Sequence, residues 1–126
     1  MGKKIMVSVF LLWLLAAWTN GKTSPPVPVV AAPVAQTLHV KHEVRGKDIF
    51  VECVVDHFSF KKGVHDKKEG EGHIDVYVNG QKVNEVFTAA FVVRGLPSGK
   101  HIVRLELVHN DSTKYGVAHE FEVNIP

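Results

Sequence analysis

Residues 73–80 read His-Ile-Asp-Val-Tyr-Val-Asn-Gly, and this stretch decides the fold. Its first six positions alternate between polar or aromatic and aliphatic side chains, which is the period of a half-buried β-strand. Asn79-Gly80 follows and favours a two-residue hairpin, because a type I′ turn needs positive φ at both central residues. A return strand is expected over residues 81–87. The stretch therefore predicts a β-hairpin with one apolar face.

The same alternation recurs along the rest of the chain. Further strands are expected at residues 38–44, 49–55, 91–93, 101–109 and 119–125. Ile49, Val51, Cys53 and Val55 share a face that is wholly apolar, so this face is expected to point inward. No segment has the period of an amphipathic helix. About seven short strands separated by turns predict an all-β fold, an immunoglobulin-like antiparallel sandwich.

The N-terminal residues have the pattern of a secretory signal. Lys3 and Lys4 precede an apolar run over residues 5–18, and Thr19-Asn20-Gly21 follows. This run is shorter than the roughly 20 residues of a spanning helix. We therefore expect a signal peptide over residues 1–21, with cleavage after Thr19 or Gly21, and a secreted or cell-envelope location. The alternative is a retained signal anchor, which would be the domain's one contact with the membrane.

A tether and a single folded domain are expected after the signal. Residues 22–35 contain four prolines, which favour extended backbone and a spacing role. The sandwich domain is expected over residues 36–126. The chain has 15 Lys and Arg against 13 Asp and Glu, and loss of Lys3 and Lys4 brings these numbers into balance. Because binding to phosphate backbones requires a basic surface, nucleic acid is excluded as a partner.

Cysteine and methionine usage narrows the chemistry further. Cys53 is the one cysteine of the chain, so no intramolecular disulfide can form and the domain must rely on its core. Its place on the inward face predicts an inert, buried thiol. Both methionines lie in the predicted signal segment, which excludes a methionine-ligated copper site in the domain.

Histidine is the unusual component, because all eight histidines follow residue 36. His73 and Asp75 project from the same face of one expected strand, about 7 Å apart, and could chelate one metal ion. A third ligand would come from His109 or Asp111 at a strand end, or from His65 in the long charged loop. The alternative is that this face is simply solvated. Zinc or copper would be the metal at such a site, and no other cofactor is expected.

The remaining histidines are expected to be structural. His101 and His109 bracket the apolar stripe of their strand and would lie at the two rims of the core. His119 opens the last strand on its inward side. No nucleophile elbow, His-Glu-x-x-His, phosphate-binding loop or Cys-x-x-Cys motif is present. The chain is therefore predicted not to be an enzyme.

Three segments carry a resemblance to a family. They are residues 70–80, residues 95–101 (Gly-Leu-Pro-Ser-Gly-Lys-His) and residues 108–111 (Val-His-Asn-Asp). The chain resembles small exported bacterial β-domains that have a Gly-His-x-His-x-Tyr-x-Asp-Gly hairpin, a Leu-Pro-x-Gly-x-His turn and an Asn-Asp-His end, over roughly residues 58–115. The resemblance implies a fold and a compartment more than an activity.

The chain departs from the family pattern at two positions. Asp75 replaces the second histidine of the hairpin, and Ser112 replaces the histidine after Asn-Asp. If the family pattern holds a metal, this chain keeps His73, His101 and His109 and offers Asp75 as an oxygen ligand. An oxygen ligand disfavours copper and leaves zinc or no metal.

These observations support three hypotheses on function. The first is an exported, non-enzymatic binding or interaction module of the cell envelope, whose partner is an envelope protein of unknown identity. The second is a weak zinc- or copper-binding protein that uses His73, Asp75, His109 and Asp111. The third is an accessory domain of an envelope enzyme. A metal site requires a second ligand beside His73, whereas an interaction module requires an exposed apolar patch or a free sheet edge.

Overall fold

A computed structural model describes residues 35–126 of the chain. The predicted signal segment and almost all of the predicted tether lie outside these residues. The strands are β1 (Leu38–Arg45), β2 (Asp48–Val55), β3 (Ser59–Phe60), β4 (Glu71–Val78), β5 (Gln81–Val86), β6 (Ala90–Val93), β7 (Gly99–Val108) and β8 (Lys114–Ile125). Residues 35–126 contain no helix that is long and apolar enough to cross a membrane.

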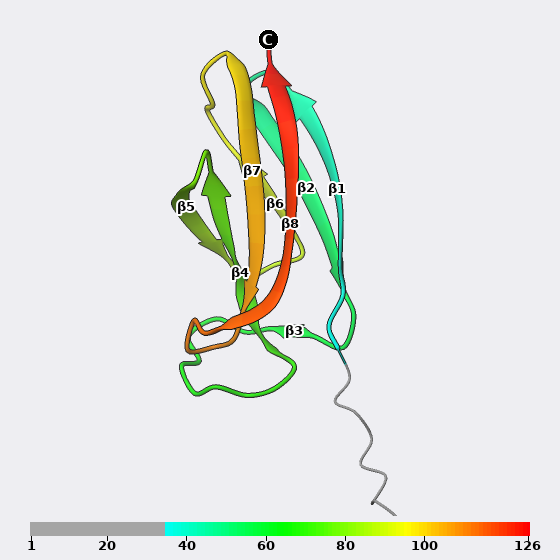
Figure 1. Ribbon diagram of the computed structural model, residues 1–126, viewed down its shortest axis with the longest axis vertical. Coiled ribbons are helices and arrows are strands. Elements are labelled where there is room, and N and C mark those ends of the chain that lie inside the picture. Colours follow the sequence, from blue (N-terminus) through cyan, green and yellow to red (C-terminus); the bar gives the residue numbers. More distant parts are fainter. Residues whose placement is uncertain (1–34) are drawn as a thin grey trace, which may run out of the picture. The chain divides into compact units, whose positions relative to one another are not determined.

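The strands form two sheets. One has the order β1-β2-β6, and the other has the order β3-β4-β7-β8 with β5 also paired to β4. All pairs are antiparallel except β3 with β4, which is parallel. The sheets lie face to face, with β1 beside β8 at one side of the sandwich and β5 at the opposite side (Figure 1). His42 stacks on Phe121 with ring centroids 4.1 Å apart and joins the sheets at the β1–β8 side.

The core lies between the sheets and follows from strand alternation. Ile74 and Val76 of β4 and Leu105 and Leu107 of β7 have no exposed surface, and they face Ile49 of β2 across the sandwich. Because successive side chains of a strand point to opposite faces, this inward stripe sends His73 and Asp75 to the outer face of β4. The packing of the core therefore fixes the orientation of the candidate ligands.

The predicted immunoglobulin-like sandwich is confirmed. A three-stranded sheet packs on a sheet in which β5, β4, β7 and β8 lie side by side in this order, which is the strand order of immunoglobulin-type folds. Residues 35–126 form eight strands where about seven were predicted, because the two-residue strand β3 pairs with the start of β4. The last strand begins at Lys114, five residues earlier than predicted.

Cys53 lies on the inward face of β2, as predicted, and is 3% exposed. Burial raises the pKa of its thiol to about 11, because an apolar environment disfavours the thiolate. The thiol therefore stays protonated at neutral pH and acts as a small apolar side chain.

The core position of Leu105 gives a first prediction. Leu105→Ala removes a fully buried side chain and should lower the free energy of unfolding by about 2–5 kcal/mol, as measured by urea denaturation. Ile102→Ala on the same strand is the control, because Ile102 is 39% exposed and should lose well under about 1 kcal/mol. Equal losses in the two variants would contradict the assignment of faces on β7.

Candidate metal site on the outer face of β4 and β5

Three potential ligands converge on the outer face of β4 and β5. Asp75 pairs in register with Glu85 of β5, and His73 precedes Asp75 on the same face of β4. His73 Nε2 lies 3.5 Å from Asp75 Oδ1 and 4.0 Å from Glu85 Oε1. One ligand atom from each residue lies within 4.8 Å of the others. We call His73, Asp75 and Glu85 the β4–β5 site.

Two of the three ligands are buried without a hydrogen-bond partner. The side chains of His73 and Asp75 are each 6% exposed, although they lie on an outer sheet face. His73 Nε2 and Asp75 Oδ1 make no hydrogen bond within the described residues. A buried polar atom without a partner costs roughly 1–3 kcal/mol. A ligand that both atoms could bind would recover this cost.

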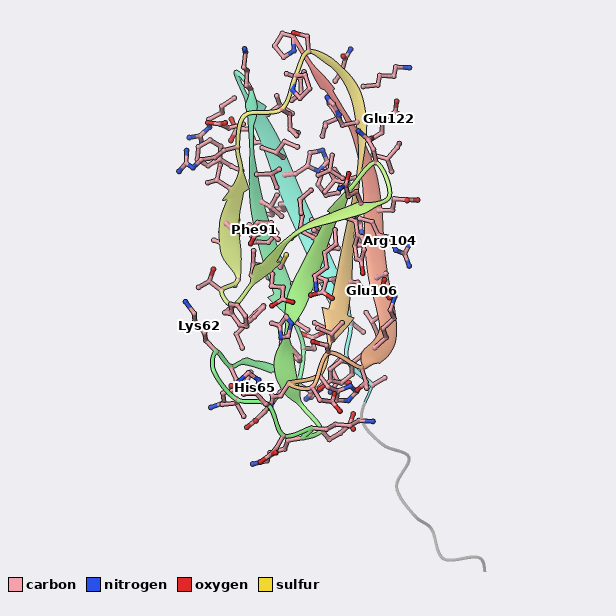
Figure 2. All side chains as sticks on the ribbon, turned by 90° about the vertical axis from the view of Figure 1, so that its left-hand side faces the viewer. Lys62, His65, Phe91, Arg104, Glu106 and Glu122 are labelled. Atoms are coloured by element: carbon pink, nitrogen blue, oxygen red, sulfur yellow. The ribbon has the colours of Figure 1, made fainter. Side chains whose placement is uncertain are left out.

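Phe87 forms one wall of the site. Its ring centroid lies 4.8 Å from that of the His73 imidazole, and the two rings are tilted by 38°. Lys62 Nζ lies over the Phe87 ring, 5.8 Å from its centroid. Lys62 belongs to the loop between β3 and β4, which lies at one end of the sandwich (Figure 2). Phe87 therefore contacts both the His73 imidazole and Lys62 of the loop.

A lysine lies beside the two carboxylates. Lys82 Nζ is 2.7 Å from Glu85 Oε2, a hydrogen bond, and 3.4 Å from Asp75 Oδ1. The hydrogen bond with Glu85 raises the pKa of Lys82, and the same bond lowers the pKa of Glu85. The ammonium supplies the positive charge that these two carboxylates need.

A third carboxylate extends the row across the sheet. Glu106 of β7 pairs in register with Asp75 on the side away from Glu85. Like charges on directly opposite residues destabilise a sheet unless they are compensated. Arg104 Nε and Lys114 Nζ provide the compensation, at 3.3 and 3.5 Å from Glu106 Oε1. Arg104 and Glu106 are next to each other along this face (Figure 2). Glu106 therefore forms ion pairs with Arg104 and Lys114 and not with Lys82.

The structure does not bring the other predicted ligands into the β4–β5 site. His109 stacks on Tyr115, with ring centroids 3.6 Å apart, and its Nδ1 lies 3.1 Å from the Thr113 carbonyl oxygen. Asp111 accepts hydrogen bonds from the Thr113 amide and hydroxyl groups. Both residues belong to the turn between β7 and β8. Thr113 closes this turn through its contacts with His109 and Asp111. His65 is exposed in the β3–β4 loop (Figure 2). Glu85 is the third ligand that the geometry offers instead.

His101 has the structural role that its rim position predicted. Asn79 Oδ1 accepts a hydrogen bond from the Ile102 amide, so the Asn79 amide nitrogen faces His101 Nδ1, at 2.9 Å. Nδ1 is then the acceptor, and His101 Nε2 donates to the Pro97 carbonyl oxygen at 2.7 Å. Both ring nitrogens are satisfied, so His101 has no free position for a metal.

Sequence reasoning missed Glu85 because of a β-bulge. A two-residue Asn-Gly turn pairs Val78 with Gln81, and a regular ladder would continue to Asp75 opposite Asn84. The register shifts after the pair of Tyr77 with Lys82, so Asp75 lies opposite Glu85. A bulge adds one residue to one strand and re-aims the side chains around it. The charge and spacing of Lys82 and Glu85 do not by themselves reveal this shift.

Gly72 allows β4 to approach β7 just before His73. A Cβ atom at this position would lie 1.8 Å from the Val108 carbonyl oxygen. Val108 is the register partner of His73, and Gly72 is also the partner of Phe60 in β3. Only glycine lets three strands meet here, so Gly72 fixes how closely β4 approaches β7 next to His73.

No family model matches this chain, and no curated protein sequence matches it. Among solved structures, the chain is similar to the PKD1 domain of the metalloprotease PrtV from Vibrio cholerae. The two share 12% sequence identity, with a TM-score of 0.46, over 73% of this chain and 98% of that one. The strand order and register described above establish the fold of this chain.

The contact at Gly72 gives a second prediction. Gly72→Ala should lower the free energy of unfolding by about 3 kcal/mol or more, because the methyl group meets a backbone carbonyl that cannot move aside. Gly63→Ala is the matched control, since Gly63 has positive φ but open space around its Cβ position. Gly63→Ala should lower the free energy of unfolding by only roughly 1–2 kcal/mol, which is the cost of left-handed backbone at a residue that has a Cβ atom. Thermal unfolding of both variants measures the difference, and equal losses would refute the close contact.

Proposed function

We propose that this domain is an exported, non-enzymatic binding module and that its ligand is a divalent transition-metal ion, zinc in preference to copper. The observation that carries the proposal is that two buried atoms, His73 Nε2 and Asp75 Oδ1, make no hydrogen bond among the described residues and lie 3.5 Å apart with Glu85 beside them. Export is supported by the basic, apolar and polar order of residues 1–21.

The donor set supports zinc. One imidazole nitrogen and two carboxylate oxygens are ligands that Zn²⁺ accepts, with a water molecule as the fourth. Calcium and magnesium prefer oxygen ligands alone, and a His nitrogen works against them. Cu(I) is disfavoured because the site has no thiolate or thioether ligand. The ligand atoms need to move closer together to reach bonding distances of about 2 Å. Glu85, 41% exposed, has room to make this movement.

Zinc titration by calorimetry is the direct test. One zinc ion should bind per chain at neutral pH, and His73→Ala and Asp75→Asn should each weaken binding at least about tenfold, because each removes a ligand. His65→Ala is the control and should bind like the wild type, since His65 lies outside the site. Unaltered binding by His73→Ala, or no binding by the wild type, would refute the proposal.

A groove between the two sheets favours a second candidate function, the binding of an envelope protein. The groove has a volume of about 440 Å³ and is lined by Val76, Val78, Val83, Phe91 and Leu96, among others. It lies between β5 and β6, and each of these strands is at an edge of its sheet. An extended segment of a partner could pair with a free edge and place alternate apolar side chains in the groove.

Envelope association tests this second candidate. Val83 is 52% exposed at the groove, and Val83→Glu should reduce the fraction of the protein recovered with the envelope of the producing cell severalfold, because it buries a charge under the incoming segment. Val54→Glu is the control, since Val54 is 60% exposed and does not line the groove. If both variants stay with the envelope like the wild type, the groove is not the docking site.

A further inference from the structure

We propose that Lys82 is the resident cation of the β4–β5 site and that a metal ion binds by displacing its ammonium group. Lys82 thereby sets the affinity of the site and is released to solvent when the metal binds. This inference rests on the proposed metal-binding function and adds a residue that competes with the metal ion for the site.

The position of the ammonium supports the exchange. Lys82 Nζ lies 3.4 Å from Asp75 Oδ1 and 2.7 Å from Glu85 Oε2, so it is shared by the two carboxylates that would bind the metal. Asp75 Oδ1 lies near both His73 Nε2 and Lys82 Nζ, so a divalent ion bonded to this oxygen and to His73 would be repelled by the ammonium beside it. The two cations are therefore alternative occupants of one place.

The site is built so that the lysine can leave. The side chain of Lys82 is 40% exposed, whereas those of His73 and Asp75 are 6% exposed. Lys82 lies on an edge strand, and its long side chain has several rotatable bonds through which the ammonium can reach water. The two buried ligands stay in place, so the exchange changes the cation and leaves the anionic part of the site intact.

The β-bulge explains why Lys82 and Glu85 lie on the same face. In a regular strand, residues 82 and 85 would lie on opposite faces, because they are three positions apart. The extra residue between the pair of Tyr77 with Lys82 and the pair of Val76 with Asn84 is Val83, and it places Glu85 on the face of Lys82. The bulge thus brings Glu85 to the face that carries Asp75 and Lys82, so that one lysine lies beside two carboxylates.

Charge neutrality explains why a resident cation is present. Glu106, in register with Asp75, is paired with Arg104 and Lys114, whereas Asp75 and Glu85 rely on Lys82. Burying Asp75 without a positive charge nearby would be strongly unfavourable. Lys82 therefore keeps the site stable without metal, and a metal ion must compete with it. Weak metal binding follows.

The test compares zinc affinity in the wild type, Lys82→Ala and Lys82→Gln by calorimetry at constant pH. Both variants should bind zinc about tenfold more tightly or better, because the competing ammonium is gone. The alanine variant excludes the case in which the side-chain carbonyl group introduced by Lys82→Gln becomes an extra ligand. Lys100→Gln is the matched control, since Lys100 Nζ pairs with Glu122 Oε2 at 3.6 Å away from the site, and its affinity should not change.

Two further readouts separate exchange from a change in folding. Zinc should increase the rate at which Lys82 of the wild-type protein is methylated by formaldehyde and borohydride, measured peptide by peptide, and should leave Lys100 unchanged. Thermal unfolding should show that Lys82→Ala is less stable than the wild type without zinc and recovers with it. If the wild type binds zinc and Lys82→Ala binds it equally tightly or more weakly, the proposed exchange is wrong but the proposed metal site is not. Absence of zinc binding in the wild type and in both variants overturns the metal site itself.

Discussion

The domain depends on the apolar contact between β4 and β7 and its packing against β2. Ile74, Val76, Leu105 and Leu107 are fully buried, and no disulfide supports them, because Cys53 is the one cysteine of the chain. This layer fixes which face of β4 points outward. Since side chains alternate strictly along a strand, the burial of Ile74 and Val76 and the outward placement of His73 and Asp75 have the same cause. Core and site therefore cannot vary independently.

The outer face of the β4 sheet has an unusual balance of charge for a surface. Glu85, Asp75 and Glu106 lie opposite one another across three strands, and two of these carboxylates are almost wholly buried. Surface ion pairs contribute little to stability, but a buried carboxylate without a cation is costly. The bulge in β5 and the cations of β7 and β8 are thus part of the fold as much as of the site. The proposed metal site and the ion-pair network share the same residues, and the bound cation distinguishes them.

The sequence was sufficient to predict the sandwich, the Asn-Gly hairpin and the inward face of β2, because alternation and turn chemistry are local properties. It also predicted the pair His73 and Asp75, which share one strand. It could not predict Glu85 as their neighbour, since that depends on one extra residue in the return strand. His109 and Asp111 were placed by sequence at the correct strand end, but their partners in the β7–β8 turn depend on tertiary contacts that periodicity does not encode. The short strand β3 was missed because two residues carry no period.

The loop between β3 and β4 has a closed neck and an exposed tip. The Ser59 amide donates to the Gly70 carbonyl oxygen, the Lys61 amide donates to the Gly72 carbonyl oxygen, and the Tyr115 hydroxyl bridges the Gly70 amide and the Glu71 carbonyl oxygen. The neck holds the two ends of the loop together whatever lies between them. Residues 62–65 can therefore change in length during evolution with little effect on the sandwich, as is usual for exposed loop tips. The same property makes this tip a suitable place to insert a reporter peptide or a fluorophore.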